Sequence, residues 1–376
     1  MQPLFREFTK FFPNTLIFTG LWPGYVPGLE GTFSIRQLRG IRFVTLKRGT
    51  RGYESGFAWP PHSIFYELLR FRPHVMFVSG FNLWSLYGLC LKPFIRSRIV
   101  LLWDGVSPAV AYLQAPIRLT IRRIMARFFD GCISNSREGV EYLRTVLRVP
   151  DSKLRRHPYE VPSVELFHRQ NTRVDTLDSW VSPRFLYVGQ LIERKGINNL
   201  LLACSLLKKE GVGRFSTIIV GDGTQRVALR DLASKLGLSD QIHWAGQVNY
   251  EELGSYYRAC DVFVFPTQED IWGMVPLEAM VFGKAVLCSK FAGSHEMISH
   301  GKNGFVFDPN DPQELAHYMA RFMRDPQLME RFGEASKQLI SSYTPELAAS
   351  VLAATVARVL QQRISSPPHV PEEVSA

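Results

Sequence analysis

The stretch VFVFPTQEDIWGMVPLEAMVFGKAVLCSKFAGSHEMI, residues Val262–Ile298, decides the fold. Its first four residues have the Val and Phe composition of a buried parallel strand, and Pro266 ends that run. A polar loop leads to a helix entered at Pro276, where a missing N–H costs nothing. The helix stops at Gly283, and a second apolar run, AVLCS, follows at once. The order strand, loop, helix, strand predicts one step of a parallel α/β sheet.

Two carboxylates bracket the loop of this stretch. Asp270 lies on the loop itself, and Glu278 lies in the first turn of the helix. Loops at the carboxyl edge of an open parallel sheet bind ligands, and a carboxylate there can accept hydrogen bonds from vicinal hydroxyls of a sugar or ribose. Gly273 allows a close approach, and the amides of Trp272, Gly273 and Met274 can donate to a ligand. Solvation or the helix macrodipole explains either carboxylate alone, but the combination favours a binding site.

Composition is that of a globular protein. The chain has 376 residues, enough for two domains, and 46% of them are apolar. Its five cysteines form no CxxC or Cys/His cluster, so neither a disulfide framework nor a zinc site is indicated. The N-terminus lacks the apolar core of a signal peptide, and the apolar segment 75–91 is too short and too interrupted to span a membrane. We therefore expect a cytoplasmic protein, either free or peripheral on the inner face of the membrane.

Positive charge is concentrated in the first half. Residues 1–162 contain 23 Lys and Arg against 10 Asp and Glu, whereas the remainder contains 21 against 24. This excess favours an anionic partner, such as nucleic acid, an anionic membrane face or a phosphorylated acceptor, although solvated helix faces explain it as well. Nucleic acid fits only the charge, because the first half shows no recognisable nucleic-acid-binding motif.

The membrane alternative makes a specific prediction about the helix expected at 115–129. Basic residues of 36–51 and of this helix would face an anionic bilayer, the helical ones being Arg118, Arg122, Arg123 and Arg127. The apolar side chains in contact with the interface would be Leu119, Ile124, Phe128 and Phe129.

Apolar runs and helical patterns alternate regularly after residue 60, which predicts doubly wound parallel sheets. Expected strands are 74–78, 99–103, 131–134, 184–188, 217–220, 242–244, 262–265, 285–289 and 304–307. Expected helices are 62–71, 82–91, 115–129, 136–147, 197–210, 226–236, 251–258, helices within 313–343, and a long final helix at 346–363. Before residue 60 we expect a helix at 4–12, short strands at 15–18 and 41–46, and a loop rich in Gly and Pro at 20–31.

The second half resembles the family 4 glycosyltransferases, which have the GT-B fold. The D-x7-E spacing from Asp270 to Glu278, the sequence LEAM and the following glycine and strand resemble the E-x7-E signature of that family. Asp270 replaces the first Glu, as in a subset whose loop reads D-x-W-G. The resemblance runs from about Pro60 to Arg363. It implies an α/β protein with two Rossmann-like, doubly wound domains that face each other across a cleft.

The resemblance also implies a domain plan. An acceptor-binding domain would span 1–162, a linker 163–183, and a nucleotide-sugar-binding domain 184–345. The helix at 346–363 would cross back to the first domain, and the tail at 364–376, rich in Pro, Ser and Glu, is expected to be disordered.

The implied activity is transfer of a hexose-type sugar from a nucleotide diphosphate sugar to a hydroxyl of a glycan or lipid-linked acceptor. The family resemblance implies retention at the anomeric carbon, no cofactor and no required metal, in polysaccharide or glycoconjugate synthesis. Glu278 would bind the ribose hydroxyls, whereas Asp270, the amides of 272–274 and Val275 would hold the donor sugar. With no strong nucleophile evident, the leaving phosphate is expected to assist the acceptor on the front side of the sugar.

The loop Gly189–Gly196 follows an expected strand and opens a helix, where free amides and the helix dipole favour an anion. Arg194 and Lys195 add two positive charges that can neutralise a diphosphate leaving group without a metal. Lys195 matches the phosphate-binding lysine of the family. Gln190 replaces the family's arginine, and Arg194 is expected to compensate. The alternative is a solvated basic turn.

Three further segments resemble loops of the family that face the donor. Gly246–Val248 resembles the loop that contacts the nucleobase through its backbone. Gly221–Gly223 resembles the family's GDG turn, although a tight turn with Asp222 capping the next helix explains it equally. His295 lies in the segment GSHEMI, which resembles the last of these loops.

In the first half, Asp104 follows the expected strand 99–103, where relatives have a His or an acidic residue. It either contacts the transferred sugar or the acceptor, or forms an ordinary Asp-Gly turn. Ser134, Asn135 and Ser136 either line the cleft or cap a helix. The candidate catalytic residues are therefore Asp104, Lys195, Asp270 and Glu278.

One departure from the family pattern leaves a second function open. Family enzymes open with a buried strand and a glycine-rich loop, and we expect this chain to lack that strand. A non-catalytic or decayed nucleotide-sugar-binding subunit of a glycan-assembly system is therefore the alternative.

Overall fold

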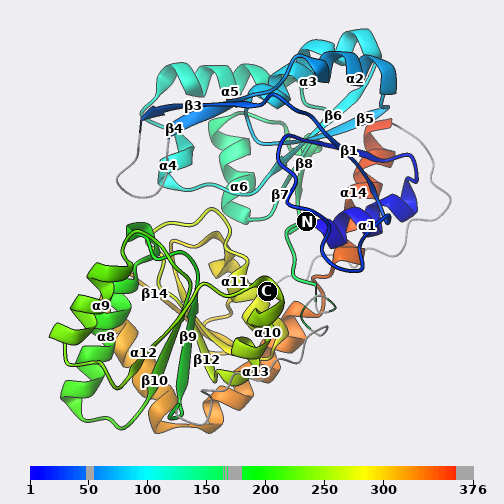
Figure 1. Ribbon diagram of the computed structural model, residues 1–376. Helices are drawn as coiled ribbons and strands as arrows, with labels where there is room; N and C mark the ends of the chain where they lie inside the picture. Colours follow the sequence, from blue (N-terminus) through cyan, green and yellow to red (C-terminus); the bar gives the residue numbers. More distant parts are fainter. Residues whose placement is uncertain (48–54, 164, 166, 168–179, 361–376) are drawn as a thin grey trace. The chain divides into compact units, whose positions relative to one another are not determined.

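The computed structural model describes residues 1–47, 55–163, 165, 167 and 180–360. The expected tail at 364–376 lies outside these residues, as does most of the expected linker. The described residues form two compact units, one of residues 1–47, 55–161 and 344–360, the other of residues 162–163, 165, 167 and 180–343. The long helix α14 (Pro345–Leu360) is part of the first unit (Figure 1).

The second unit is built on a six-stranded parallel sheet with strand order β11-β10-β9-β12-β13-β14. Its strands are β9 (Arg184–Val188), β10 (Ser216–Val220), β11 (Ile242–Gly246), β12 (Val262–Phe265), β13 (Ala285–Ser289) and β14 (Gly304–Phe307). Alternate residues of β9 enter two different core clusters: Phe185 and Tyr187 lie in one, Leu186 and Val188 in the other. Such strands are buried on both faces, which explains their continuous apolar runs.

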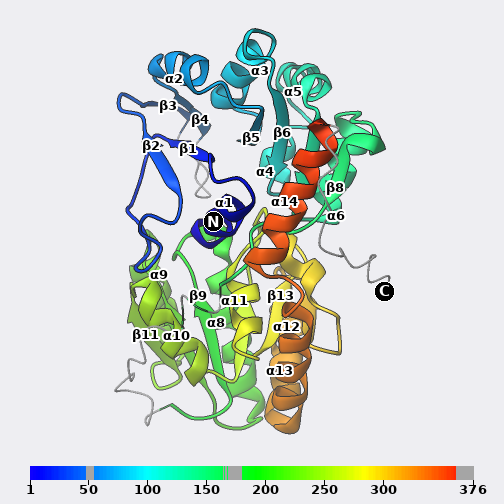
Figure 2. The same cartoon turned by 90° about the vertical axis from the view of Figure 1, so that its right-hand side faces the viewer.

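Helices cover both faces of this sheet (Figure 2). Helices α8 (Ile197–Glu210), α9 (Arg226–Lys235) and α12 (Pro312–Arg324) pack with Phe185 and Tyr187. Helices α10 (Tyr250–Ala259) and α11 (Val275–Val281) pack on the other face, and α13 (Gln327–Ile340) contributes to both clusters. Strand order reverses at β9, which pairs with β10 on one side and β12 on the other. The carboxyl ends of β9 and β12 therefore form the topological switch point, where open α/β sheets bind ligands.

The first unit contains a four-stranded parallel sheet with strand order β5-β6-β7-β8. Its strands are β5 (Val75–Ser79), β6 (Arg98–Trp103), β7 (Gly131–Ser134) and β8 (Leu154–Arg156). Its helices are α2 (Ser63–Phe71), α3 (Leu83–Ile95), α4 (Pro108–Ala111), α5 (Pro116–Phe128) and α6 (Arg137–Glu141). The helix expected at 136–147 is α6 followed by a π-helical turn, Tyr142–Val146. In the part of the chain that the structure describes, no helix is long and apolar enough to cross a bilayer.

The start of the chain forms elements outside that sheet. Helix α1 (Gln2–Phe11) packs against α14. Strands β1 (Leu16–Thr19) and β2 (Ser34–Gln37) form a parallel pair, and β3 (Arg42–Lys47) and β4 (Ser55–Trp59) an antiparallel one. The glycine- and proline-rich segment 20–31 follows β1 at once. The strand and the glycine-rich loop expected at 15–18 and 20–31 are therefore present, but β1 is only half-buried and pairs with β2, not with the four-stranded sheet.

Two aromatic residues of the expected linker are part of the second unit. Phe167 is fully buried and Trp180 is 9% exposed, and both lie in the core cluster that contains Tyr257. Removing these large side chains from water stabilises the unit. The expectation of a linker throughout 163–183 is therefore wrong at these positions.

Helix α5 and the residue after it include buried side chains that were expected to face a membrane. Arg122 and Phe129 are buried, and Leu119 packs against the core. Arg122 donates a hydrogen bond to the hydroxyl of Tyr142 at 3.1 Å. Its guanidinium also lies over the rings of Tyr112, Trp103 and Phe81. The membrane-facing assignment of these three residues of 115–129 is therefore wrong, and Arg48 and Arg51 lie outside the described residues.

Candidate functional site

The loops after β9 and β12 are fixed against each other at the switch point. Gly196 has a φ of 69°, and a Cβ atom there would lie 2.0 Å from the carbonyl oxygen of Pro266. Only glycine fits, because both the backbone conformation and the lack of space exclude a side chain. The amide of Gln268 donates to the carbonyl oxygen of Arg194 at 2.7 Å, and the Thr267 hydroxyl donates to the same oxygen at 3.1 Å.

Opposite charges meet across these two loops. The ammonium group of Lys195 donates to Oδ2 of Asp270, and Nη1 of Arg194 lies 3.8 Å from the same oxygen. Nη1 of Arg194 also donates to the carbonyl oxygen of Glu269 at 3.1 Å. The side chains of Lys195, Arg194 and Asp270 are 12, 15 and 17% exposed. Burial lowers the pKa of Lys195, and the Asp270 carboxylate partly opposes that change.

The loop after β13 fixes the backbone of Asp270. The amide of Asp270 donates to the carbonyl oxygen of Phe291 at 3.1 Å, and its own carbonyl oxygen accepts from Gly293 at 3.0 Å. The amide of Ser294 donates to the carbonyl oxygen of Trp272 at 2.8 Å. In the same segment, Nδ1 of His295 lies 2.8 Å from the carbonyl oxygen of Ala292. The segment GSHEMI thus supports the Asp270 loop.

The residues between Asp270 and α11 differ in what they expose. Trp272 is only 2% exposed and its side chain packs in the core beneath the loop. Gly273 has a φ of 87°, and a Cβ atom there would lie 2.8 Å from the ring of Phe265. Met274 and Val275 are half-buried at the start of α11. At Trp272, therefore, only backbone groups are candidates for contact with a ligand.

Glu278 is buried, at 4% exposed, and two tyrosines of α10 donate to its carboxylate. The Tyr250 hydroxyl donates to Oε1 at 3.2 Å, and the Tyr257 hydroxyl donates to Oε2 at 2.8 Å. Burial raises the pKa of Glu278, and these two hydrogen bonds partly oppose the rise. Neither tyrosine was predicted from the sequence. Their spacing of seven residues, about two helical turns, was the available signal.

The remaining expected donor-binding residues lie at the carboxyl ends of β9, β10 and β11. The amide of Gly189 donates to the carbonyl oxygen of Val220 at 3.0 Å, and the amide of Gly221 donates to the carbonyl oxygen of Gly246 at 2.7 Å. A Cβ atom on Gly221 would lie 1.9 Å from the carbonyl oxygen of Gly189, so these backbones pack directly together. Val248 is half-buried against the core of the second unit.

Asp222 does not cap the next helix as expected. Its carboxylate accepts from the amide of Gly223 at 2.7 Å and pairs with Arg226 at 3.0 Å. The residue at the N-cap of α9 is Gln225. Asp222 therefore stabilises the GDG turn itself.

Asp104 lies in the first unit, at the carboxyl end of β6. It accepts a hydrogen bond from the Tyr159 hydroxyl, and burial raises the pKa of Asp104. The side-chain oxygen of Asn135 accepts from the amide of Tyr159 at 2.8 Å. The side-chain oxygen of Ser136 accepts from Gly139 at 3.0 Å, which confirms that Ser136 is a helix cap.

Three buried polar atoms surround the same edge of the first sheet. These atoms are Trp103 Nε1, Ser107 Oγ and Ser134 Oγ, and none of them has a hydrogen-bond partner within the described residues. Buried donors and acceptors normally have partners, and one left without a partner is a place where water or a ligand can bind. Asp104 therefore lies in a polar, incompletely paired environment.

Lys195, Arg194 and Asp270 are thus brought together at the switch point, and Glu278 lies in the helix that follows their loop. Asp104 belongs to the other unit. The described residues contain no group of three or more His, Cys, Asp or Glu that could hold a metal ion, and the metal requirement stays a prediction.

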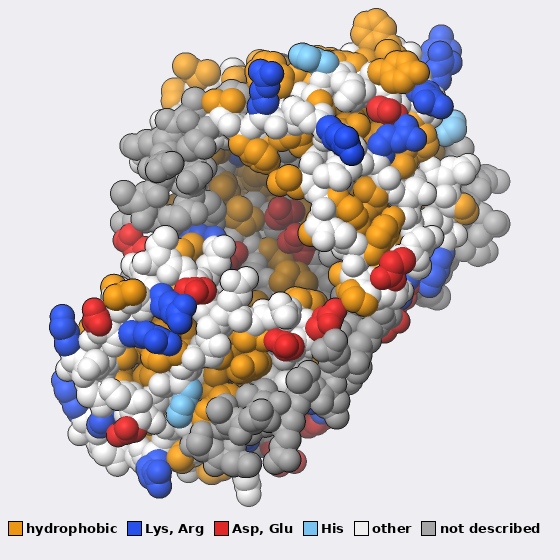
Figure 3. All heavy atoms as spheres, in the orientation of Figure 1, with side chains coloured by type: hydrophobic (Ala, Val, Ile, Leu, Met, Phe, Trp, Pro, Cys, Tyr) orange, Lys and Arg blue, Asp and Glu red, His pale blue; other side chains and the backbone are white. Residues whose placement is uncertain are grey.

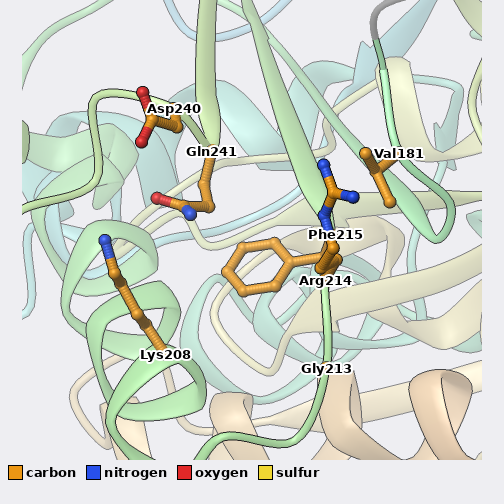
Figure 4. Close-up of a pocket in the computed structure, with 7 residues that line it drawn as sticks. All are labelled: Val181, Lys208, Gly213, Arg214, Phe215, Asp240 and Gln241. Carbon is orange, nitrogen blue, oxygen red and sulfur yellow. The ribbon is translucent and has the colours of Figure 1, made fainter.

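A small hollow lies at the opposite edge of the second sheet (Figure 4). It is lined by Val181, Lys208, Gly213, Arg214, Phe215, Asp240 and Gln241. These residues lie at the amino ends of β10 and β11, at the carboxyl end of α8 and just before β9. None of the expected site residues lines this hollow.

The two parallel sheets define the class of protein. Each unit is a Rossmann-like α/β unit, and the expected GT-B fold is confirmed by solved structures. The Anabaena protein HepE in complex with UDP is similar over 95% of this chain and 96% of its own, with a TM-score of 0.73 and 17% identity. The sucrose-phosphate synthase of Thermosynechococcus elongatus is similar over 95% of this chain and 92% of its own, with a TM-score of 0.69 and 20% identity. At these identities the likeness shows the fold.

The match to a known sequence family lies in the second unit. Residues 175–339 match the family described as Glycosyl transferases group 1. The D-inositol 3-phosphate glycosyltransferase of Streptomyces avermitilis is 28% identical over 184 residues, which are 47% of this chain and 40% of that protein. The alpha-D-kanosaminyltransferase of Streptomyces kanamyceticus is 29% identical over 157 residues, 42% of this chain and 40% of that protein. The chain thus spans about two fifths of the length of these curated relatives.

Proposed function

We propose that this protein is a glycosyltransferase that moves a hexose-type sugar from a nucleotide diphosphate sugar to a hydroxyl of a glycan or lipid-linked acceptor. The observation that best supports this proposal is the position of Lys195 and Arg194 beside Asp270 at the switch point. These residues lie inside the segment that matches Glycosyl transferases group 1. Solved structures of HepE contain UDP in one case and UDP-glucose in another, which supports a nucleotide sugar as the donor of this protein. The alternative of a non-catalytic subunit is not favoured, because the relatives named above are described as glycosyltransferases.

The two cations would bind the diphosphate of the donor. Lys195 is held by Asp270, so the ammonium group would need little reorganisation to meet the phosphate. A preorganised charge of this kind stabilises the negative charge that develops as the sugar–phosphate bond breaks. Asp270 and the backbone of 272–275 would then contact hydroxyls of the sugar.

Glu278 would accept hydrogen bonds from the ribose hydroxyls. A carboxylate has roughly four lone-pair sites, and the hydroxyls of Tyr250 and Tyr257 occupy one site on each oxygen. The remaining capacity fits two vicinal hydroxyls. The tyrosines would orient the carboxylate for that contact.

We propose that the reaction proceeds with retention and without a cofactor or required metal. The acceptor oxygen forms a bond to the anomeric carbon on the face from which the diphosphate departs. Its proton passes to the departing phosphate oxygen. Asp104, in the first unit, would contact the acceptor or the transferred sugar, and Gly246 and Val248 the nucleobase. The protein would be cytoplasmic, with a peripheral contact to an anionic membrane.

A panel of nucleotide sugars tests this proposal. A thermal-shift screen should identify a donor that raises the melting temperature, and NMR of the product should show the anomeric configuration of the donor. Turnover should continue in EDTA. Binding without transfer to any glycan or lipid-linked acceptor would support the non-catalytic alternative, and restoration of lost turnover by Mg²⁺ would contradict the metal-free reaction.

A further inference from the structure

The outward side of helix α5 is apolar. Ile117, Ile121, Ile124 and Phe128 are 77, 49, 50 and 58% exposed. At about 100° per residue, these four positions fall within about 60° of one another around the helix axis. A surface helix normally presents polar side chains to water on its outer side. The pattern of α5 is therefore inverted, since its outermost stripe is aliphatic and aromatic.

Exposed apolar side chains continue beyond both ends of this helix. Phe94, at the carboxyl end of α3, is 78% exposed, and Leu113, just before α5, is 63% exposed. The ammonium group of Lys92 on α3 donates to the carbonyl oxygen of Phe128 at 2.6 Å, which joins the ends of α3 and α5. We name the following set the apolar ridge: Phe94, Leu113, Ile117, Ile121, Ile124 and Phe128. Several exposed apolar side chains gathered on neighbouring elements mark a candidate interaction site.

Positive charges accompany the apolar ridge. Neither α3 nor α5 contains an Asp or Glu, whereas α5 contains four arginines. Of these, Arg118 and Arg127 are exposed, and helical periodicity places them on opposite sides of the stripe. Arg96, at the end of α3, is exposed as well. Figure 3 shows hydrophobic and basic side chains side by side over the helices of the first unit.

We infer that the apolar ridge, together with Arg96, Arg118 and Arg127, is a docking surface for an anionic lipid bilayer. The apolar side chains would enter the boundary between head groups and acyl chains, while the arginines reach the lipid phosphates. A second copy of this chain complements the surface less well, because the arginines of the two copies would face each other across a symmetric interface. The inference rests on the membrane contact proposed above and assigns it to a surface of the first unit, so loss of vesicle binding and loss of donor binding by the second unit are measured separately.

Co-sedimentation of the full chain with lipid vesicles tests this inference. The protein should bind vesicles of phosphatidylcholine mixed with phosphatidylglycerol at low salt, bind them more weakly at high salt, and bind phosphatidylcholine alone poorly. The double variant Ile121→Gln, Ile124→Gln should lose at least tenfold in vesicle affinity, because two exposed aliphatic groups can no longer leave water. Arg118→Gln, Arg127→Gln should lose about fivefold for each charge and flatten the salt dependence.

Matched control variants lie on the second unit. Leu202 and Val227 are 38 and 71% exposed on α8 and α9, and the double variant Leu202→Gln, Val227→Gln should bind vesicles as the unchanged protein does. Lys209→Gln, Lys235→Gln is the corresponding charge control. All four sites are exposed, so far-UV circular dichroism and nucleotide binding should remain unchanged in every variant.

Three outcomes would overturn the inference. The first is no binding to the phosphatidylglycerol vesicles at low salt. The second is an equal loss in the ridge variants and their controls. The third is a concentration-dependent dimer, seen by light scattering, that Ile121→Gln, Ile124→Gln abolishes in a protein without vesicle affinity, since a second copy would then be the partner.

Discussion

The carboxyl edges of the two parallel sheets differ in charge and in packing. In the second unit, two cations share one carboxylate, and glycine positions lock the surrounding loops by backbone contact. In the first unit, Asp104 is paired with a tyrosine hydroxyl, and nearby polar atoms are buried without a partner among the described residues. Similar topology therefore supports different chemistry. The charged, locked edge suits a diphosphate, whereas the polar, incompletely paired edge suits hydroxyl groups.

The largest loss of turnover is expected from substitution of Lys195. Lys195→Met keeps the bulk of the side chain but removes the charge proposed to stabilise the leaving diphosphate. Turnover should fall by a factor on the order of 100 to 1,000, the usual loss for one preorganised charge-stabilising donor. Steady-state kinetics with the preferred nucleotide sugar measure it. Lys290→Met, which removes an exposed partner of Asp308, is the control, and an equal effect in both variants would contradict the assignment.

A smaller loss is expected at Glu278. Glu278→Gln keeps the shape but removes the charge that strengthens hydrogen bonds to ribose hydroxyls. A hydrogen bond to a charged group contributes about 1.5–3 kcal/mol, so nucleotide affinity should fall by roughly ten- to a hundredfold. Titration calorimetry measures the affinity, and Glu334→Gln on the surface of α13 should change nothing. Unchanged affinity in the Glu278 variant would remove this residue from the site.

The first unit should respond differently. Asp104→Asn removes a charge in the edge that the account assigns to the acceptor or transferred sugar, so transfer should fall about tenfold while the affinity for a nucleoside diphosphate stays the same. Asp151→Asn, at an exposed ion pair of the same unit, should leave both quantities unchanged. If Asp104→Asn weakens binding of the nucleoside diphosphate instead, the two edges do not have separate roles.

The smallest expected effect is a pH dependence of stability. Burial raises the pKa of Glu278, so the folded protein holds this proton more tightly than the unfolded chain. The resulting stabilisation is complete below the unfolded pKa, about 4.3, and is lost as pH rises through the folded pKa. Glu278→Gln cannot titrate, so its free energy of unfolding should fall less than that of the unchanged protein between acid and neutral pH. Urea denaturation at several pH values would show parallel curves if the raised pKa were wrong.

Sequence alone predicted the second sheet closely because its strands are buried on both faces. Val262–Phe265 is entirely apolar, and Ala285–Ser289 is apolar up to its final serine, so the bounds of both strands are clear from the sequence. The same pattern predicted the parallel α/β sheets, whereas the GT-B fold was implied by the resemblance to family 4 glycosyltransferases. The loops of Lys195 and Asp270 were both assigned to the donor site, and they meet because loops that leave neighbouring strands share one edge. The small first strand was identified as a strand, but its pairing with β2 depends on contacts that the local sequence does not encode.

Side-chain partners across elements were not predictable in the same way. Tyr257 reaches Glu278 only because α10 packs beside α11 on one face of the sheet. Arg122 looked like a surface charge, yet it is buried under three aromatic rings. The usual burial pattern of an amphipathic helix is therefore reversed in α5, because Arg122 is buried whereas Ile117 and Ile121 are exposed. Periodicity gave the helix but not which of its sides faces the core.

Hydrogen exchange with and without the nucleoside diphosphate of the preferred donor tests the central claim most directly. We expect slower exchange in peptides that cover 189–196, 246–248 and 268–278, the loops at the carboxyl edge of the second sheet. Peptides at 208–215 and 240–241, which line the hollow at the opposite edge, should exchange as they do without nucleotide. Protection confined to the hollow, or no protection of the three carboxyl-edge segments by a nucleotide that binds, would contradict the account.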